Sequence, residues 1–384
     1  MNIRKISSYS EFLPLKRDWN NLLKESGHDS VFLRHEWFSL WWKSHGNLYE
    51  KNQNICILII EDGDKPIGII PLKTSRVKYR GLEVKKLGFI ESELSPYVDF
   101  IIISDKEQCI RESLRFLRLH VLWDVLILNK FPVVSPNYRV LESILSEQGI
   151  MYGINPSLDT PVVNTSGEWP DYLSQRSSKF RKSLRNKLNK AKKTADLQIE
   201  KFSEAHDIKD KLPRVFEISK RSWKAKIGQS IADSKEYTDF LGYIPDEMCN
   251  NGWVNLWLLK NSNEYIAYEY HLKYNGIVYP IAADFDERFR ALSPGSILEY
   301  NIIKELFEDP EVKQYYTCAQ DYKYLRNWTD LVEPHVDIEI FNSKPLGLAL
   351  YVFEYRMLPF IRKTPLFQYV KNHLMKRNTS EKNT

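Results

Sequence analysis

The chain has 384 residues, of which 43% are apolar and 27% are charged, and its formal net charge is +5. This composition is typical of a soluble globular protein, and the length predicts two domains rather than one core. The mild net charge excludes a polycation that binds nucleic acid over its whole surface, so the position of the cations matters more than their sum.

The cysteines and histidines give no sign of a disulfide or metal site. Cys56, Cys109, Cys249 and Cys318 are far apart and form no CxxC pair, which favours reduced thiols in the core. The eight histidines show no ligand spacing, so we expect no metal. The first residues lack the apolar core of a signal peptide and the apolar runs are too short to span a bilayer, which predicts a cytoplasmic protein.

The first half alternates predicted helices with predicted strands. Strands are expected over Cys56–Ile60, Ile67–Leu72, Phe100–Ile103 and Val125–Leu128. Helices are expected over Glu11–Lys24, Glu36–Lys43 and Cys109–Leu122, with core positions for Trp37, Trp41 and Trp42. This alternation predicts an α/β fold.

A strand–turn–strand pattern occurs twice, with a constant offset of 199 residues from Ile57 to Leu256 and from Ile67 to Ile266. A single hairpin match can arise by chance, but the similar order of elements around it favours a duplicated α/β unit. We therefore predict units over residues 1–160 and 170–342, followed by a basic amphipathic extension over 343–384. Residues 156–170, rich in Pro, Ser, Thr and Asn, are expected to connect the units.

The strongest charge feature follows that connection. Residues 172–195 contain no acid, and their cations are Arg176, Lys179, Arg181, Lys182, Arg185, Lys187, Lys190, Lys192 and Lys193. Apolar residues recur at helical spacing, which predicts an amphipathic basic helix. Three interpretations stay open: a solvated face, a site for an anionic small molecule or sugar substrate, or a surface for nucleic acid or an acidic membrane. Arg181 and Arg185, four residues apart, are the candidates for substrate contacts.

A turn between a predicted strand, Ile277–Asp284, and a predicted helix reaching Phe307 favours phosphate binding. Ser293 is expected to be the N-cap, Pro294 suits the first helical position, and Gly295 leaves room for a close neighbour. The first turn of such a helix exposes unpaired N–H groups and a positive dipole end. Arg290, Ser293, Gly295 and Ser296 are therefore candidates to hold a pyrophosphate, and an ordinary capped helix is the alternative.

The same turn resembles motif A of the GNAT acyl-CoA transferases, R/Q-x-x-G-x-G/A. Arg290 fits its first position and Gly295 its last, but Ser293 stands where the first Gly belongs, a departure that should weaken the backbone cradle. Longer stretches resemble the CelD/BcsL branch of that superfamily, which is linked to polysaccharide biosynthesis and is distantly similar to FemAB aminoacyltransferases. These stretches are Phe32–Gly46, Pro66–Leu72, Ser178–Arg185, Arg221–Lys224, Ile266–Tyr268, Leu292–Ser296 and Asp321–Trp328.

The resemblance implies two tandem GNAT-like units, each a mixed central sheet flanked by helices, with an acyl-CoA, acetyl-CoA foremost, held by the second. In GNAT chemistry the acceptor attacks the thioester directly, so a base and an acid are needed but no enzyme nucleophile. Glu269 and His271, on one strand face, and Asp284, at the end of the next strand, are the candidate bases. Each also fits a salt-bridged structural role.

The remaining candidates come from two aromatic stretches. Tyr322 or Tyr324 is the candidate acid, with aromatic packing as the alternative role. Trp223, Lys224 and Lys323 are candidates for substrate contacts, although a core position also suits Trp223.

Together these expectations favour an acyltransferase that acts on an amine or hydroxyl of a sugar or envelope-polysaccharide precursor. One rival is a FemAB-like transferase that uses charged tRNA, the one interpretation in which the basic helix binds nucleic acid. The other rival is a non-catalytic accessory protein that meets a membrane polysaccharide synthase through residues 343–384, peripherally at the inner membrane.

Overall fold

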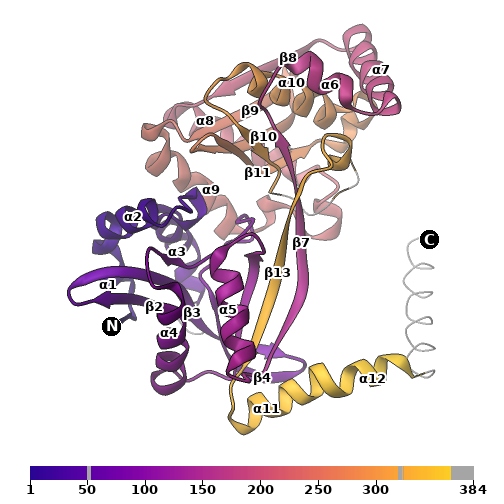
Figure 1. The fold of residues 1–384 in the computed structure, drawn as a ribbon. Helices are drawn as coiled ribbons and strands as arrows, with labels where there is room; N and C mark the ends of the chain where they lie inside the picture. Colours follow the sequence, from indigo (N-terminus) through magenta and orange to yellow (C-terminus); the bar gives the residue numbers. More distant parts are fainter. Residues whose placement is uncertain (50–52, 319–321, 323, 365–384) are drawn as a thin grey trace.

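The computed structural model describes residues 1–49, 53–318, 322 and 324–364. One mixed sheet runs through the molecule in the order β1-β2-β3-β4-β6-β13-β7-β12-β11-β10-β9-β8, and β5 pairs with β3. Helices flank this sheet in two lobes (Figure 1). The predicted α/β fold with a mixed sheet flanked by helices is confirmed.

The first lobe contains strands and helices close to those expected from the sequence. Its strands are β1 (Asn2–Ile6), β2 (Gln53–Asp62), β3 (Lys65–Tyr79), β4 (Leu82–Phe89), β5 (Ile101–Ile102) and β6 (Val125–Pro132). Its helices are α1 (Tyr9–Phe12), α2 (Lys16–Glu25), α3 (His35–Tyr49), α4 (Lys106–His120) and α5 (Pro136–Glu147). Trp37 and Trp41 are buried as expected, and Trp42 packs against the same core.

The second lobe repeats the strand order. Its strands are β8 (Leu197–Phe202), β9 (Val254–Asn261), β10 (Glu264–Tyr274), β11 (Ile277–Phe285) and β12 (Gln314–Tyr316). Its helices are α6 (Trp169–Gln175), α7 (Ser178–Thr194), α8 (Ala205–Lys220), α9 (Lys235–Met248) and α10 (Pro294–Glu308).

The hairpin repeat extends to the hydrogen-bond register. Ile60 lies opposite Gly68 in the first hairpin, and Leu259 lies opposite Ala267 in the second, so the 199-residue offset holds on both strands. Both hairpins shift register just before their turns. Because a one-residue slip would turn every side chain to the other face, a shared register with a shared irregularity supports duplication rather than chance.

Two long strands join the lobes, which the sequence did not indicate. β7 (Tyr152–Asn164) pairs with β12 of the second lobe, β13 (Val332–Phe341) pairs with β6 of the first, and β7 and β13 pair with each other. They run side by side between the lobes in Figure 1. The first part of the segment expected to connect the units, Pro156–Asn164, belongs to β7, one of these two joining strands. The predicted domain limits stay a prediction.

Helices cover both faces of the second-lobe sheet. Side chains of α7 and α10 form one core with Trp257, Ala267 and Val278, whereas those of α8 and α9 pack with Leu256 and Tyr268. This follows from strand geometry, because neighbouring residues point to opposite faces.

The first lobe also packs against the second. The Phe32 ring meets Tyr279 of β11 edge-on at 4.9 Å, and Trp37 meets Phe240 of α9 at the same distance. Arg34 Nη1 donates to the Tyr274 hydroxyl at 2.9 Å. The Phe32–Gly46 stretch therefore serves to join the lobes.

After β13 the chain continues through α11 (Pro345–Tyr351), a π-helical turn at Val352–Met357 and α12 (Leu358–Lys363). The rest of the predicted extension lies outside the described residues. Within the described part of the chain, no helix is both long enough and apolar enough to cross a bilayer.

Candidate active site

The predicted phosphate turn lies where β11 leads into α10. Ser293 takes a left-handed conformation, with φ 55° and ψ 50°, and its side chain makes no capping hydrogen bond. Ser293 occupies the predicted N-cap position, but its hydroxyl does not cap the helix, because an extended N-cap conformation is the one that turns the side-chain oxygen toward the first turn. The backbone instead keeps the shape that a Gly would adopt, so the Ser at the motif's Gly position does not abolish the turn.

The first turn of α10 provides free hydrogen-bond donors. Pro294 has no N–H, and the N–H groups of Gly295 and Ser296 lie too early in the helix to reach a helical acceptor. A Cβ added at Gly295 would meet only Phe285 Cδ1, at 3.4 Å, which is ordinary contact. Local packing therefore tolerates a side chain at this position, and the glycine is not required by a close neighbour.

Two lysines of the basic helix reach this turn. The helix forms as predicted over Ser178–Thr194, with Leu184 and Ala191 buried. Lys187 Nζ donates to Ser296 Oγ at 2.9 Å, and Lys190 Nζ donates to the carbonyl of Ala291 at 2.8 Å. Their positive charges add to the dipole end of α10.

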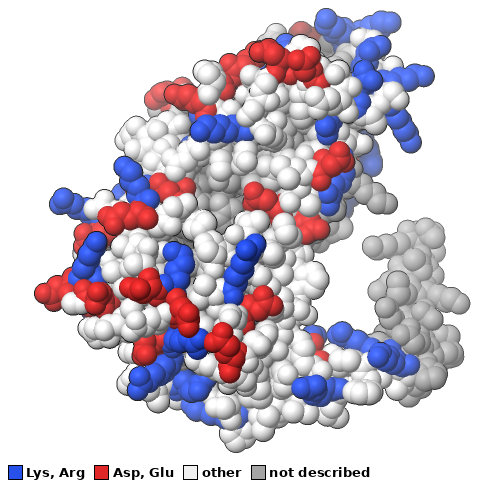
Figure 2. Space-filling view, viewed as in Figure 1, with Lys and Arg blue, Asp and Glu red and all other residues white. Residues whose placement is uncertain are grey.

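Neither lysine was singled out from the sequence, because they lie about a hundred residues upstream of the turn. Arg181 instead donates to the carbonyl of Arg176, while Arg185 is exposed. Arg290 is also exposed, with its side chain 76% accessible beside Glu287. Lys and Arg side chains gather over α7 in Figure 2.

β11 and β12 separate next to this turn. They pair only at Ile277–Gln314 and Val278–Tyr315, although β11 continues to Phe285. Cys318 has φ 52°, a left-handed conformation that turns the chain out of the strand direction. Among the described residues, the edge of β11 beyond Val278 has no strand partner on the β12 side, which leaves backbone groups available along it.

The candidate bases lie on opposite faces of the sheet. Asp284 lies opposite Tyr268, and Glu269 lies opposite Ala283, so the two carboxylates point to different sides. Asp284 Oδ2 accepts from Ser219 at 3.0 Å and from Tyr268 at 3.3 Å.

Lys224 completes the surroundings of Asp284. Its Nζ is 3.2 Å from Asp284 Oδ1 and donates to the carbonyl of Ala283 at 2.7 Å. Burial raises the pKa of Asp284, although Lys224 opposes the shift. Trp223, beside Lys224, is 37% exposed, so the alternative core position for this indole is wrong and the ring remains available for contacts.

Glu269 and His271 form a buried pair on the α10 side. His271 Nε2 is 2.8 Å from Glu269 Oε2, which also accepts from the Tyr315 hydroxyl at 3.2 Å. His271 is only 1% exposed. Reaching an acceptor from this pair would require the surrounding core to open.

Glu299 of α10 was missed by sequence analysis. Its burial, followed by the charge of Glu269, raises its pKa to about 8. It occupies a position on the apolar face of α10, between Leu298 and Ile302, where a carboxylate is unusual. That break in an otherwise apolar pattern is the signal that could have identified it.

Tyr324 lies near carboxylates of both faces. Partial desolvation and then the charges of Glu299 and Glu269 raise its pKa, with a further contribution from Asp284. Its ring is 56% exposed and stacks with Tyr322 at a centroid distance of 5.8 Å. A tyrosine phenol is protonated at neutral pH and can serve as a proton donor, and the raised pKa makes Tyr324 a weaker acid than a free tyrosine. Lys323, the remaining candidate, lies outside the described residues.

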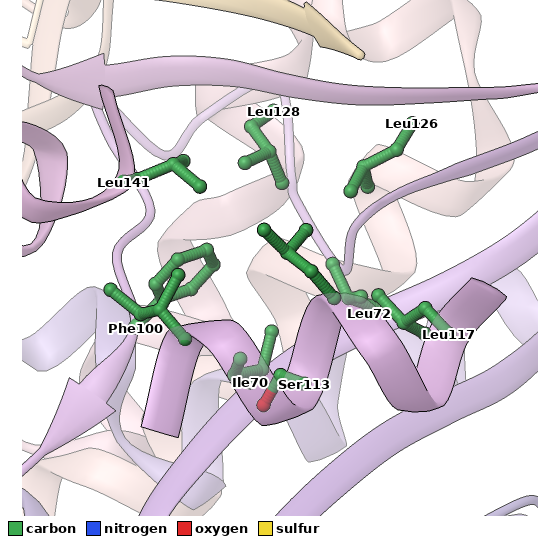
Figure 3. Close-up of a pocket in the computed structure, with 10 residues that line it drawn as sticks. Ile70, Leu72, Phe100, Ser113, Leu117, Leu126, Leu128 and Leu141 are labelled. Carbon is green, nitrogen blue, oxygen red and sulfur yellow. The ribbon is translucent and has the colours of Figure 1, made fainter. Parts of the chain in front are cut away.

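Other parts of the described chain show no comparable site. The first lobe contains a small closed void lined almost wholly by apolar side chains, including Ile70, Phe100 and Leu128 (Figure 3). Among the described residues, no group of three or more His, Cys, Asp or Glu side chains could hold a metal ion.

A known family model matches part of the second lobe. Residues 178–326, which span α7, the phosphate turn and Tyr324, match the family model described as an acetyltransferase (GNAT) domain. No curated protein matches the chain with significant similarity.

Solved structures share the fold at low sequence identity. FemX is 9% identical with a TM-score of 0.58, covering 91% of this chain and 100% of FemX. A conserved protein of unknown function from Bacteroides thetaiotaomicron is 9% identical with a TM-score of 0.58, covering 88% and 100%. L-PGS from Bacillus licheniformis is 10% identical with a TM-score of 0.51, covering 88% and 95%. Residues 178–326 are thus similar to a GNAT-type acetyltransferase domain, and the chain has an α/β fold similar to that of FemX.

Proposed function

We propose that this protein transfers an acyl group from acyl-CoA, acetyl-CoA foremost, to an amine or hydroxyl of a sugar or envelope-polysaccharide precursor. The observation that carries the proposal is the meeting of three positive features at one turn. The N–H groups of Gly295 and Ser296, the positive end of α10 and the Lys187 ammonium all lie where β11 has lost its strand partner. Such a combination fits a pyrophosphate, and the adjoining strand edge fits the amides of the attached arm.

The roles of the remaining residues follow from their environments. Asp284 is the proposed base, since it lies at the end of β11 and its raised pKa favours proton acceptance. Tyr324 is the proposed acid, since its phenol is partly exposed and lies within the charge field of Glu299, Glu269 and Asp284. The chain need supply no nucleophile, because holding donor and acceptor together favours direct attack. The sugar acceptor is supported by the stretches that resemble the CelD/BcsL group.

Binding of acetyl-CoA, followed by calorimetry, tests the proposal. Lys187→Ala should weaken binding about tenfold, the cost of one charge-assisted contact of about 1.4 kcal/mol. Lys193→Ala removes an equal charge from an exposed position on the same helix and serves as the matched control. If both variants lost the same affinity for acetyl-CoA, the loss would be due to net charge alone, and Lys187 would not be a contact in the site.

A second variant tests the turn itself. Gly295→Trp should abolish acetyl-CoA binding without unfolding the protein, because its Cβ meets no close neighbour while the indole would cover the free N–H groups. Undiminished binding by a folded Gly295→Trp protein would mean that the carrier lies elsewhere.

The exposed face of α7 favours a second candidate function. Its solvent-facing cations, with no acid among them, also suit a polyanion, as in a transferase that takes an aminoacyl group from charged tRNA. Tight binding of charged tRNA with a steep salt dependence, without acyl-CoA turnover, would favour that candidate. Failure to bind either donor would favour a non-catalytic accessory protein.

A further inference from the structure

The described chain ends in a helical segment that projects from the first lobe. It comprises residues 345–363 and follows β13 directly (Figure 1). We refer to it as the C-terminal foot.

One side of the foot is fixed to the long strands. The Tyr355 hydroxyl donates to Glu339 Oε2 at 2.8 Å and accepts from Asn155 Nδ2 at 2.9 Å. The Tyr355 ring lies against the backbone of Gly153, where an added Cβ would be 1.9 Å from Cζ. Arg80 donates to both oxygens of Glu354 at 2.6 Å. The foot is thus held in a defined orientation.

The rest of the foot presents apolar side chains to solvent. Phe360 is 74% exposed, Met357 is 51% exposed and Leu348 is 48% exposed. Val352, Phe353 and Ile361 are each exposed by 37–38%. Single exposed apolar residues are common, but six within fourteen positions form a patch of the kind that marks an interaction surface.

Cations lie among these apolar side chains. Arg356, Arg362 and Lys363 are exposed, whereas Glu354, the acid of the π-helical turn, is neutralised by Arg80. Blue side chains follow the foot in Figure 2. Mixed large apolar and basic side chains on one projecting helix match an anionic bilayer, whose interior accepts the apolar groups and whose headgroups attract the cations.

We propose that the C-terminal foot docks this protein peripherally on an anionic lipid bilayer. Docking does not depend on the acyltransferase activity, so either proposal can fail without the other. It would bring the protein close to substrates that are attached to lipid.

Vesicle flotation of the full chain tests the proposal. Vesicles of phosphatidylcholine with phosphatidylglycerol should carry the protein, those of phosphatidylcholine alone should carry much less, and added salt should weaken the binding. The double variant Met357→Ser with Phe360→Ser should reduce partitioning at least tenfold, because two large apolar groups no longer enter the bilayer.

Matched control variants distinguish lipid binding by the foot from non-specific hydrophobic adsorption and from lipid binding by the basic helix α7. Leu119→Ser with Leu122→Ser alters two residues that are 65% and 66% exposed elsewhere, and it should leave flotation unchanged. Lys192→Gln with Lys193→Gln, on α7, should also have little effect, whereas Arg356→Gln with Lys363→Gln should release the protein.

Several results would overturn the proposal. Flotation that is equal for the parent protein and the foot variants, or lost only in the α7 variant, would place lipid contact elsewhere. Absence of binding to anionic vesicles at low salt would exclude a lipid surface. Self-association that disappears in the foot variant, without vesicle binding, would assign the patch to a second copy of the chain.

Discussion

The buried carboxyl of Glu299 provides a test of the electrostatics of the candidate site, because its pKa should affect the stability of the protein. The residue is 9% exposed, and its carboxyl lies within the charge field of Glu269 and Lys187. Burial and the Glu269 charge raise its pKa from 4.5 to about 8, while a hydrogen bond with Trp328 and the Lys187 charge act in the opposite direction. At neutral pH the native protein should therefore hold a proton there that the unfolded chain releases.

The sign and size of the effect follow from proton linkage. Because the folded pKa is the higher one, the stability from this group is complete below pH 4.5 and is lost as the pH rises through about 8. Between these limits the free energy of unfolding should fall by about 1.4 kcal/mol per pH unit. Glu299→Gln mimics the neutral acid and does not titrate, so its stability relative to the parent protein should improve by roughly 2 kcal/mol between pH 6 and pH 8.

Denaturant unfolding at a series of pH values, followed by tryptophan fluorescence, measures this difference. Glu308→Gln, on the exposed side of the same helix, is the control and should track the parent protein. Parallel stability curves for Glu299→Gln and the parent protein over this range would refute a buried protonated carboxyl at Glu299.

Three further predictions concern single positions. Ser293→Gly should raise the free energy of unfolding by about 1 kcal/mol in denaturant titrations, since Ser293 has φ 55°, whereas Ser293→Val should lower it by more. Ser113→Ala should stabilise the first lobe by about 1 kcal/mol in thermal unfolding, because its hydroxyl is buried at the apolar void without a hydrogen-bond partner in the described structure; a lower melting temperature would indicate a hidden partner. Gly153→Ala should detach the C-terminal foot, because its Cβ would meet Tyr355. Proteolysis between Tyr351 and Lys363 should then accelerate, and an unchanged rate would contradict the packing.

Neither the contact of Lys187 with the start of α10 nor the proximity of Tyr324 to Asp284 could be predicted from the sequence. Lys187 is one of many cations on α7, and the sequence does not show which of them contacts α10. Only the packing of α7 against α10 brings Lys187, rather than Arg181 or Arg185, to Ser296. The split of Asp284 and Glu269 across the sheet depends on the register of β10 and β11, which short-range patterns do not specify.

Local interactions determined what the sequence alone could predict. Periodicity located α7, Pro294 and the apolar run after it located α10, and the 199-residue offset revealed the two hairpins, because these features depend on neighbours within a few residues. Long-range packing decided the rest. The exchange of β7 and β13 between the lobes, the burial of Glu299 and the outward face of the foot depend on segments far apart in the chain. These features are stabilised or destabilised by tertiary contacts and by desolvation, and neither can be predicted from the local sequence pattern.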